Sequence, residues 1–366
     1  MSREIDRVDH VLFGACVILT IFGFAMVWSA SQVVAIERFD DSAYYFKRQI
    51  MWAVIAAVCA LLLYKADEAV LDRFIIPVFA ASVVLLFAVH IPGLGLKISG
   101  ATRWLKIGPL PAVQPFEFAK VMFVLFAAKA ASDTALTSFS KFARLTIVTA
   151  VVGLGLVLQR DFGGTMIVAV LYLVFLMLSG VPGYMFAFLM PVIGIAAAVL
   201  VKVEPYRMKR IFAFLDPWAD YFASGWQTVQ SLIAVGTGGI FGVGFGQSQQ
   251  KFFYLPTPHT DYIFSIIGEE WGLLGTGLVL ALFGVILWRG MFIALHVANK
   301  FHKALAAGLT VMILTQALVH MGVATGMLPA KGTTLPFISS GGSALVSAFA
   351  AASLLLMISK KVGGRA

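Results

Sequence analysis

Charge is scarce in this chain of 366 residues. Only 12% of the residues are charged and 60% are hydrophobic, whereas a soluble domain has about 25% charged and about 45–50% apolar residues. This is too little charge to cover a water-facing surface, which excludes a water-soluble globular enzyme and a disordered chain. The chain has long apolar runs instead. Because about 20 residues cross a bilayer as a helix, the composition indicates a polytopic membrane protein.

Other signals are also missing. The two cysteines, Cys16 and Cys59, lie inside apolar runs, so they are interpreted as core residues, and a disulfide scaffold is excluded. The histidines have no metal-ligand spacing, and the glycine-rich segment 236–246 contains no phosphate-binding motif, so neither a zinc site nor a nucleotide site is predicted. The net charge of +9 lies mostly in short loops, which favours anionic lipid over nucleic acid as its partner.

Ten apolar runs predict ten membrane-spanning helices, because a helix satisfies its own backbone hydrogen bonds in lipid. Ten spans place both termini on one side of the membrane. Lysine and arginine are denser in the segments on that side, which predicts that both termini are cytoplasmic. We therefore expect an all-α polytopic membrane protein with one domain over residues 1–366. The predicted runs are 11–35, 49–64, 74–90, 113–131, 142–158, 164–180, 183–201, 262–288, 304–327 and 342–359.

Two predicted outer segments, 91–112 and 202–261, are too long and polar to be simple connectors. A structureless loop of about 60 residues is uncommon and is usually functional. The second segment, a large extracytoplasmic loop between the seventh and eighth spans, interleaves Arg210 and other basic residues with aromatic ones. That composition is typical of a segment in the lipid headgroup layer. This part of the segment is either an interfacial helix that only anchors the loop or one that contacts a substrate.

Some predicted spans contain ionisable residues. Pro115 suits the first turn of the fourth helix, and Glu117 and Lys120 share one face of it because they are three residues apart. A charge inside a membrane is energetically costly, so such residues are candidates for function. The pair either holds two helices together or belongs to a polar site. In the eighth span, Glu269 and Glu270 lie deeper, and at least one of them needs a polar partner.

Two outer positions could carry chemistry. Asp261 directly precedes the eighth span, where it is predicted as a helix N-cap or, alternatively, as a general base for a substrate hydroxyl. The last outer loop, 328–343, combines Lys331, Ser339 and Ser343 with several glycines. Backbone N–H groups and positive charge at a helix start suit an anion such as a lipid pyrophosphate. A tight re-entrant turn explains the same residues.

Seven segments in order along nearly the whole chain resemble the SEDS family of peptidoglycan polymerases, which includes FtsW and RodA. In the last segment, Lys331-Gly332 before Thr-Thr-Leu-Pro-Phe resembles the cell-division member of the family rather than the elongation member. The acidic residue that is common after Leu-Pro in the family is Thr257 here. The segments are 100–108, 114–120, 159–165, 210–218, 230–236, 259–264 and 331–343.

The resemblance implies an inverting glycosyltransferase that polymerises lipid II at the outer face of a bacterial cytoplasmic (inner) membrane, for septal synthesis in cell division. Asp261 would be the catalytic base that takes the proton of the acceptor hydroxyl. Cationic side chains would stabilise the departing pyrophosphate, with Glu117 orienting Lys120. The substrate-binding residues implied in this way are Arg103, Glu117, Lys120, Arg210, Lys331, Ser339 and Ser343.

The implied partners are lipid II and undecaprenyl-linked glycan, a class B penicillin-binding transpeptidase, other divisome proteins and membrane lipids, with no nucleic acid. Whether a divalent cation assists the leaving group is left open by the sequence. The alternatives are a lipid II flippase, a non-catalytic scaffold that recruits a transpeptidase, and the elongation (RodA-type) polymerase. A flippase needs a polar path across the whole membrane, and few charges lie deep in the predicted spans.

Overall fold

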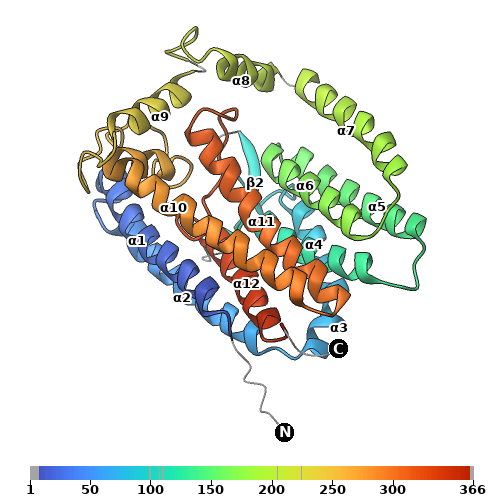
Figure 1. Cartoon of the computed structure of the whole chain (residues 1–366). Helices are drawn as coiled ribbons and strands as arrows, with labels where there is room; N and C mark the ends of the chain where they lie inside the picture. The colour runs from blue at the N-terminus through green and yellow to red at the C-terminus, as the bar shows by residue number, and fades with distance from the viewer. Residues whose placement is uncertain are drawn as a thin grey trace.

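The computed structural model describes residues 8–98, 100–106, 108, 111–203, 205–223 and 225–362. Within these residues the chain forms twelve α-helices and one two-stranded sheet (Figure 1). The helices are α1 (His10–Phe39), α2 (Tyr44–Lys65), α3 (Glu68–Ala88), α4 (Pro115–Ser132), α5 (Ser138–Leu158), α6 (Phe162–Leu178), α7 (Gly183–Val203), α8 (Pro205–Leu215), α9 (Trp226–Thr237), α10 (Ile263–His296), α11 (Lys300–Ala324) and α12 (Gly342–Ser359).

Each of the ten predicted apolar runs corresponds to one of these helices, which confirms the polytopic helical fold. Seven helices of the described chain are long and apolar enough to cross a membrane. The other three that match predicted runs are α4, which carries several charges, the shorter α6, and α7 at the edge of the bundle (Figure 1). Several boundaries were misplaced, most of all at the start of α2 (Tyr44 rather than 49), the start of α3 (Glu68 rather than 74) and the end of α10 (His296 rather than 288).

The start of α1 and the end of α12 meet at the same end of the bundle (Figure 1). The backbone N–H of Asp9 donates to the Ser359 hydroxyl at 3.2 Å, and Nε of Arg289 donates to the Asp9 carboxylate at 2.7 Å. The same carboxylate caps α1 by accepting the N–H of Leu12. These contacts fit the prediction that an even number of spans brings both termini to one side.

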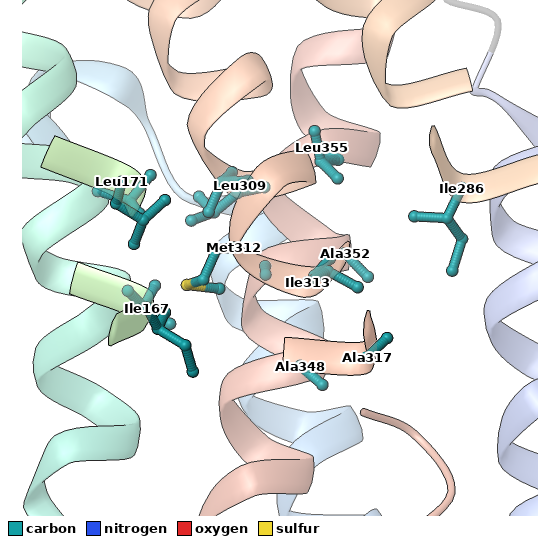
Figure 2. Close-up of a cluster of buried hydrophobic side chains, with 14 of the residues drawn as sticks. Ile167, Leu171, Ile286, Leu309, Met312, Ile313, Ala317, Ala348, Ala352 and Leu355 are labelled. Carbon is teal, nitrogen blue, oxygen red and sulfur yellow. The ribbon is translucent and has the colours of Figure 1, made fainter. Parts of the chain in front are cut away.

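Helix α11 forms the centre of the bundle. Figure 2 shows side chains of α6 beside α11 and those of α12 and α10 around it. Small residues on α12 allow close helix packing, which stabilises helix pairs in lipid through van der Waals contact. Helices at the periphery, such as α2, bury few of their side chains inside the bundle. The labelled buried residues are Ile167, Leu171, Ile286, Leu309, Met312, Ile313, Ala317, Ala348, Ala352 and Leu355.

The two long segments between predicted spans contain secondary structure, in line with the prediction that they are more than connectors. Segment 202–261 contains the end of α7 together with α8 and α9, so it is not a simple loop. Segment 91–112 contains an antiparallel hairpin of β1 (Gly95–Ile98) and β2 (Ala101–Leu105), a small element that the sequence analysis did not predict in an otherwise helical chain. Gly100 has a φ of 80°, the left-handed conformation that tight hairpin turns require. The hairpin fixes the position of the polar residues on β2.

Helix α10 is broken at Gly272, where φ is 60° and ψ is −151°. In a continuous helix, the N–H groups that follow the break would bond to carbonyls one turn earlier. Here they bond to the glycine-rich segment 239–244, and that segment in turn donates to the carbonyls released by the break. The bonds are Leu273 N to Gly239 O (2.9 Å), Leu274 N to Ile240 O (3.2 Å), Val243 N to Glu269 O (2.9 Å) and Gly244 N to Glu270 O (3.1 Å).

The glycines in segment 239–244 therefore have a structural role. A Cβ on Gly242 would lie 2.1 Å from the carbonyl oxygen of Glu270, so only glycine allows the two backbones to approach this closely. The N–H groups of Leu273 and Leu274 and the carbonyls of Glu269 and Glu270, which the break deprives of partners within the helix, are all hydrogen-bonded to this segment. A membrane environment requires such partners for backbone groups.

Candidate active site

Asp261 lies between the turn that begins at Thr257 and the start of α10. The predicted N-cap role is wrong, because the N-cap of α10 is Tyr262 and no side chain caps this helix. Instead, the Asp261 carboxylate accepts a hydrogen bond from the Thr257 hydroxyl at 3.3 Å. It also faces the last outer loop, since a Cβ on Gly332 would lie 2.8 Å from Oδ2 of Asp261. The carboxylate thus makes no capping hydrogen bond to α10, and it lies next to Gly332 of the last outer loop.

The surroundings of Asp261 tune its acidity. Burial raises the pKa of Asp261 to about 6, against the opposing effects of the Thr257 hydrogen bond and of the charges on Lys331, Arg103 and Arg210. A general base works best when its pKa lies near the operating pH. Asp261 is therefore a half-buried carboxylate with a pKa of about 6 that lies within electrostatic range of three cations.

Lys331 is held at the start of α6. Its Nζ lies 3.8 Å from Oδ1 of Asp161 and occupies the space above Gly163, where an added Cβ would come within 0.9 Å of it. Burial lowers the pKa of Lys331, and the carboxylates of Asp161 and Asp261 oppose that effect. The ammonium group therefore lies beside the carboxylate of Asp161 and within electrostatic range of Asp261.

Asp161 is a residue that the sequence analysis missed. Burial alone would raise the pKa of Asp161, but the charges of Lys331 and Arg103 and a hydrogen bond from Gly164 N (3.1 Å) outweigh it and lower the pKa. The carboxylate caps α6 and at the same time holds Lys331. Its position directly before Phe-Gly-Gly-Thr is a recognisable N-cap pattern, and that signal could have identified it.

The hairpin and α8 supply two arginines. Nε of Arg103 donates to the Gln159 carbonyl at 3.2 Å, and another nitrogen of its guanidinium donates to the Arg160 carbonyl. Arg210 of α8 donates to the carbonyl of Ala330, the residue before Lys331. Arg103 thus fixes the segment before Asp161, and Arg210 fixes the segment before Lys331. The structure brings Arg103, Arg210 and Lys331 together around the carboxylate of Asp261, as the resemblance implied.

Glu117 and Lys120 lie inside the bundle. Nζ of Lys120 is 2.5 Å from Oε2 of Glu117 and also donates to Oε1 of Gln316 on α11. Glu117 accepts the hydroxyl of Ser347 on α12 at 2.7 Å. Nε2 of Gln316 then donates to the Thr334 carbonyl at 3.1 Å, which connects the pair to the last outer loop. The pair therefore links α4, α11 and α12, and Gln316 connects it to the last outer loop.

Ser339 and Ser343 are buried and bind backbone groups. The Ser339 hydroxyl donates to the Thr260 carbonyl at 2.8 Å, and the Ser343 hydroxyl accepts the N–H of Gln114 at 3.0 Å. Ser339 therefore attaches the last loop to the turn that carries Asp261, and Ser343 attaches it to the start of α4. Both serines hold the site together in this structure.

The two glutamates of α10 have polar partners, as predicted. Glu269 accepts the Ser248 hydroxyl at 2.5 Å, and Glu270 accepts the Ser29 hydroxyl at 2.6 Å and lies 3.3 Å from Nζ of Lys251. In the described part of the chain, no three His, Cys, Asp or Glu side chains are grouped closely enough to hold a metal ion.

These features define a polytopic membrane protein with a carboxylate and three cations gathered at one end of its helix bundle. A model of the FtsW/RodA/SpoVE family of cell cycle proteins matches residues 9–363, and the chain belongs to this family.

Relatives and solved structures match over the full length. The chain is 38% identical to "Probable peptidoglycan glycosyltransferase FtsW" of Trichlorobacter lovleyi, over 96% of this chain and 93% of that protein. It is 39% identical to the stage V sporulation protein E of Bacillus subtilis, over 98% and 99% of the two chains. The crystal structure of the rod shape determining protein RodA of Thermus thermophilus matches with a TM-score of 0.73 and 27% identity, over 98% of each chain.

A second similar structure is described as "Structural coordination of polymerization and crosslinking by a peptidoglycan synthase complex". Its chain matches with a TM-score of 0.79 and 28% identity, over 98% of this chain and 99% of that chain.

Proposed function

We propose that this protein is a peptidoglycan glycosyltransferase that polymerises lipid II at the outer face of the cytoplasmic membrane, for septal synthesis in cell division. Relatives named FtsW and described as peptidoglycan glycosyltransferases support the activity and the division role. The observation that carries the proposal is the Asp261 carboxylate, with a pKa of about 6, facing Lys331, Arg103 and Arg210. A base beside several cations is what transfer of a sugar from a pyrophosphate requires.

In this reaction, the acceptor hydroxyl oxygen attacks the anomeric carbon of the donor sugar and forms a new C–O bond. The bond from that carbon to the pyrophosphate oxygen breaks, and undecaprenyl pyrophosphate leaves with the electron pair. Asp261 takes the hydroxyl proton as the general base. Lys331, with Arg103 and Arg210, stabilises the charge that develops on the departing pyrophosphate. Direct displacement from the opposite face inverts the anomeric configuration.

The other predicted residues position these groups. Ser339 holds the turn of Asp261 against the last loop, and Ser343 fixes that loop on α4. Glu117 orients Lys120, whose charge adds to the positive potential that acts on Asp161. These residues contribute to substrate binding by keeping the cations and the base in place.

The test is polymerisation of labelled lipid II by the purified protein, with strand length read on a gel. Asp261→Asn keeps the shape of the side chain but cannot take a proton, so polymerisation should fall by about 10²–10⁴-fold. Asp41→Asn is the matched control, since Asp41 is an exposed carboxylate paired with Lys47. Near-normal polymer from Asp261→Asn would overturn the base assignment, whereas an absence of polymer from the unmodified protein would favour the flippase alternative.

A class B penicillin-binding transpeptidase is the proposed partner, with other divisome proteins following from the septal role. The similarity to a chain of a complex that combines polymerisation with crosslinking supports this pairing. Co-purification from membranes with such a transpeptidase, and strand synthesis with and without it, tests the partnership.

The proposed orientation has both termini in the cytoplasm. In a background without Cys16 and Cys59, Ala219→Cys on the outer segment should react with an impermeant thiol reagent in intact cells. His296→Cys, at the end of α10, should react only after the membrane is opened. Labelling of His296→Cys alone in intact cells would reverse the orientation.

A further inference from the structure

A cavity of about 850 Å³ opens beside α8 at the outer end of the molecule. It lies between α8, the segment that connects α8 to α9, and the turn before Asp261. Its volume is within the range of about 300–1,000 Å³ that is typical of small-molecule sites. The lining residues that bear on its chemistry are Phe212, Asp216, Asp220, Phe222, Trp226 and Phe253.

The cavity borders the candidate active site at three points. Its wall includes Ala330, which directly precedes Lys331 and accepts a hydrogen bond from Arg210. It also includes Pro256, which directly precedes the Thr257 that bonds to Asp261. A third wall residue, Gln227, accepts the phenol hydroxyl of Tyr262, the residue after Asp261, at 3.2 Å. A polymer whose end lies at the carboxylate can therefore extend into this cavity.

The lining combines aromatic rings with balanced charge. The Phe222 ring is 89% exposed, and the Trp226 indole is fixed by a hydrogen bond from Nε1 to the Tyr254 carbonyl at 2.8 Å. Large exposed apolar groups in a cavity mark a binding surface. The two carboxylates of the lining are matched by two basic residues, Lys209 and Arg210. This balance suits a neutral ligand better than an anionic headgroup.

A pyranose has the complementary chemistry. Its C–H faces pack on aromatic rings, which carry a negative face. Its hydroxyl and N-acetyl N–H groups donate to carboxylates, here Asp216 and Asp220. We propose that this cavity binds sugar units of the glycan strand next to the reacting sugar, and so retains the strand between successive transfers. This inference rests on the proposed glycosyltransferase function and names a site for its polymer.

The first test measures binding without catalysis. The full-length protein in nanodiscs is titrated with the tetramer of β-1,4-linked N-acetylglucosamine, and binding is followed by saturation-transfer NMR. Phe222→Ala should weaken binding at least about 10-fold. The matched control is Phe241→Ala, an aromatic residue that is 78% exposed outside this cavity, and it should bind like the unmodified protein. Asp261→Asn should also bind normally, because the base is not part of the cavity lining.

The second test measures strand length from labelled lipid II. Phe222→Ala should give strands several-fold shorter, while the initial rate of bond formation stays close to that of Phe241→Ala. A failure of the proposed function gives no polymer from the unmodified protein, whereas a failure of this inference gives long strands from Phe222→Ala. Equal oligosaccharide binding by the two phenylalanine variants would also overturn the inference and leave these aromatic residues as anchors in the headgroup layer.

Discussion

The ammonium group of Lys331 occupies the space that a side chain on Gly163 would need, because a Cβ there would lie 0.9 Å from Nζ. The lysine is otherwise held by Asp161, 3.8 Å away. Because Gly163 of α6 has no side chain, the charged end of Lys331 can lie directly against this helix. Two segments that are far apart in the sequence share one small volume at the site.

Gly163→Ala should displace Lys331 without harming the fold. The obstructing atom is the end of a flexible side chain, and alanine favours a helix over glycine by about 1 kcal/mol. Misplacement of a catalytic group by about 1 Å can lower a rate by about 10²-fold, so lipid II turnover should fall by one to two orders of magnitude. The control is Gly153→Ala on α5, where an added Cβ meets nothing within 4 Å. Equal turnover of both variants would contradict the assigned position of Lys331.

The acidity of Asp261 should be visible in stability. Folding raises the pKa of this carboxyl from 3.8 to about 6, so the folded protein binds the proton more tightly than the unfolded chain. The resulting contribution to stability is present at low pH and is lost as the pH rises through about 6. Asp261→Asn should therefore unfold at a higher temperature than the unmodified protein at about pH 8, with a smaller difference near about pH 4. A lower unfolding temperature of Asp261→Asn at alkaline pH would contradict the burial of this charge.

The hydroxyl of Thr257 should set the pH range of activity. Its hydrogen bond lowers the pKa of Asp261, and the active base is the deprotonated form. Thr257→Val keeps the branched shape but removes the hydroxyl, so the acidic limb of the pH–rate profile should move to higher pH. Thr257→Ser keeps the hydroxyl and should leave the limb in place. The measurement is initial rate against pH at saturating lipid II, and an unmoved limb in Thr257→Val would show that the hydrogen bond has no effect on the base.

The buried pair of Lys251 and Glu270 should matter for stability more than any surface pair. Their side chains are almost fully buried and Nζ lies 3.3 Å from Oε1, so removing the lysine leaves a buried carboxylate unpaired. Lys251→Met should lower the free energy of unfolding by about 3–5 kcal/mol. Lys47→Met removes an exposed partner of Asp41 and should change little. Chemical unfolding of both variants in detergent decides the comparison, and similar effects would contradict it.

The sequence predicted those parts of the molecule that depend on local pattern. The apolar runs identified all ten helices that form the bundle, because the length and polarity of a span are properties of neighbouring residues. The hairpin was missed because a strand of only four or five residues, β1 or β2, carries too little pattern to distinguish it from a loop. Boundaries at polar ends, such as Tyr44 of α2, depend on tertiary contacts.

The sequence indicated which residues belong to the candidate site, but it did not indicate which of them contact one another. Asp261 and Lys331 were singled out from their positions beside apolar runs, whereas the roles of Arg103 and Arg210 were implied by the resemblance to the SEDS family. The N-cap prediction failed because the turn from Thr257 places Asp261 one residue too early. Asp161 was missed because its partner, Lys331, is distant in sequence.

The break at Gly272 makes the orientation of the first part of α10 independent of the length of the part that follows. In a continuous helix, one would determine the other. Inserting one residue into an unbroken helix rotates everything beyond it by about 100°, so a change in the lipid-spanning part would turn the end that follows Asp261. Here segment 239–244 fixes the register of the outer part independently. The inner part of α10 can therefore change in length or face, to suit a different bilayer thickness or helix neighbour, while the geometry at the outer surface is kept.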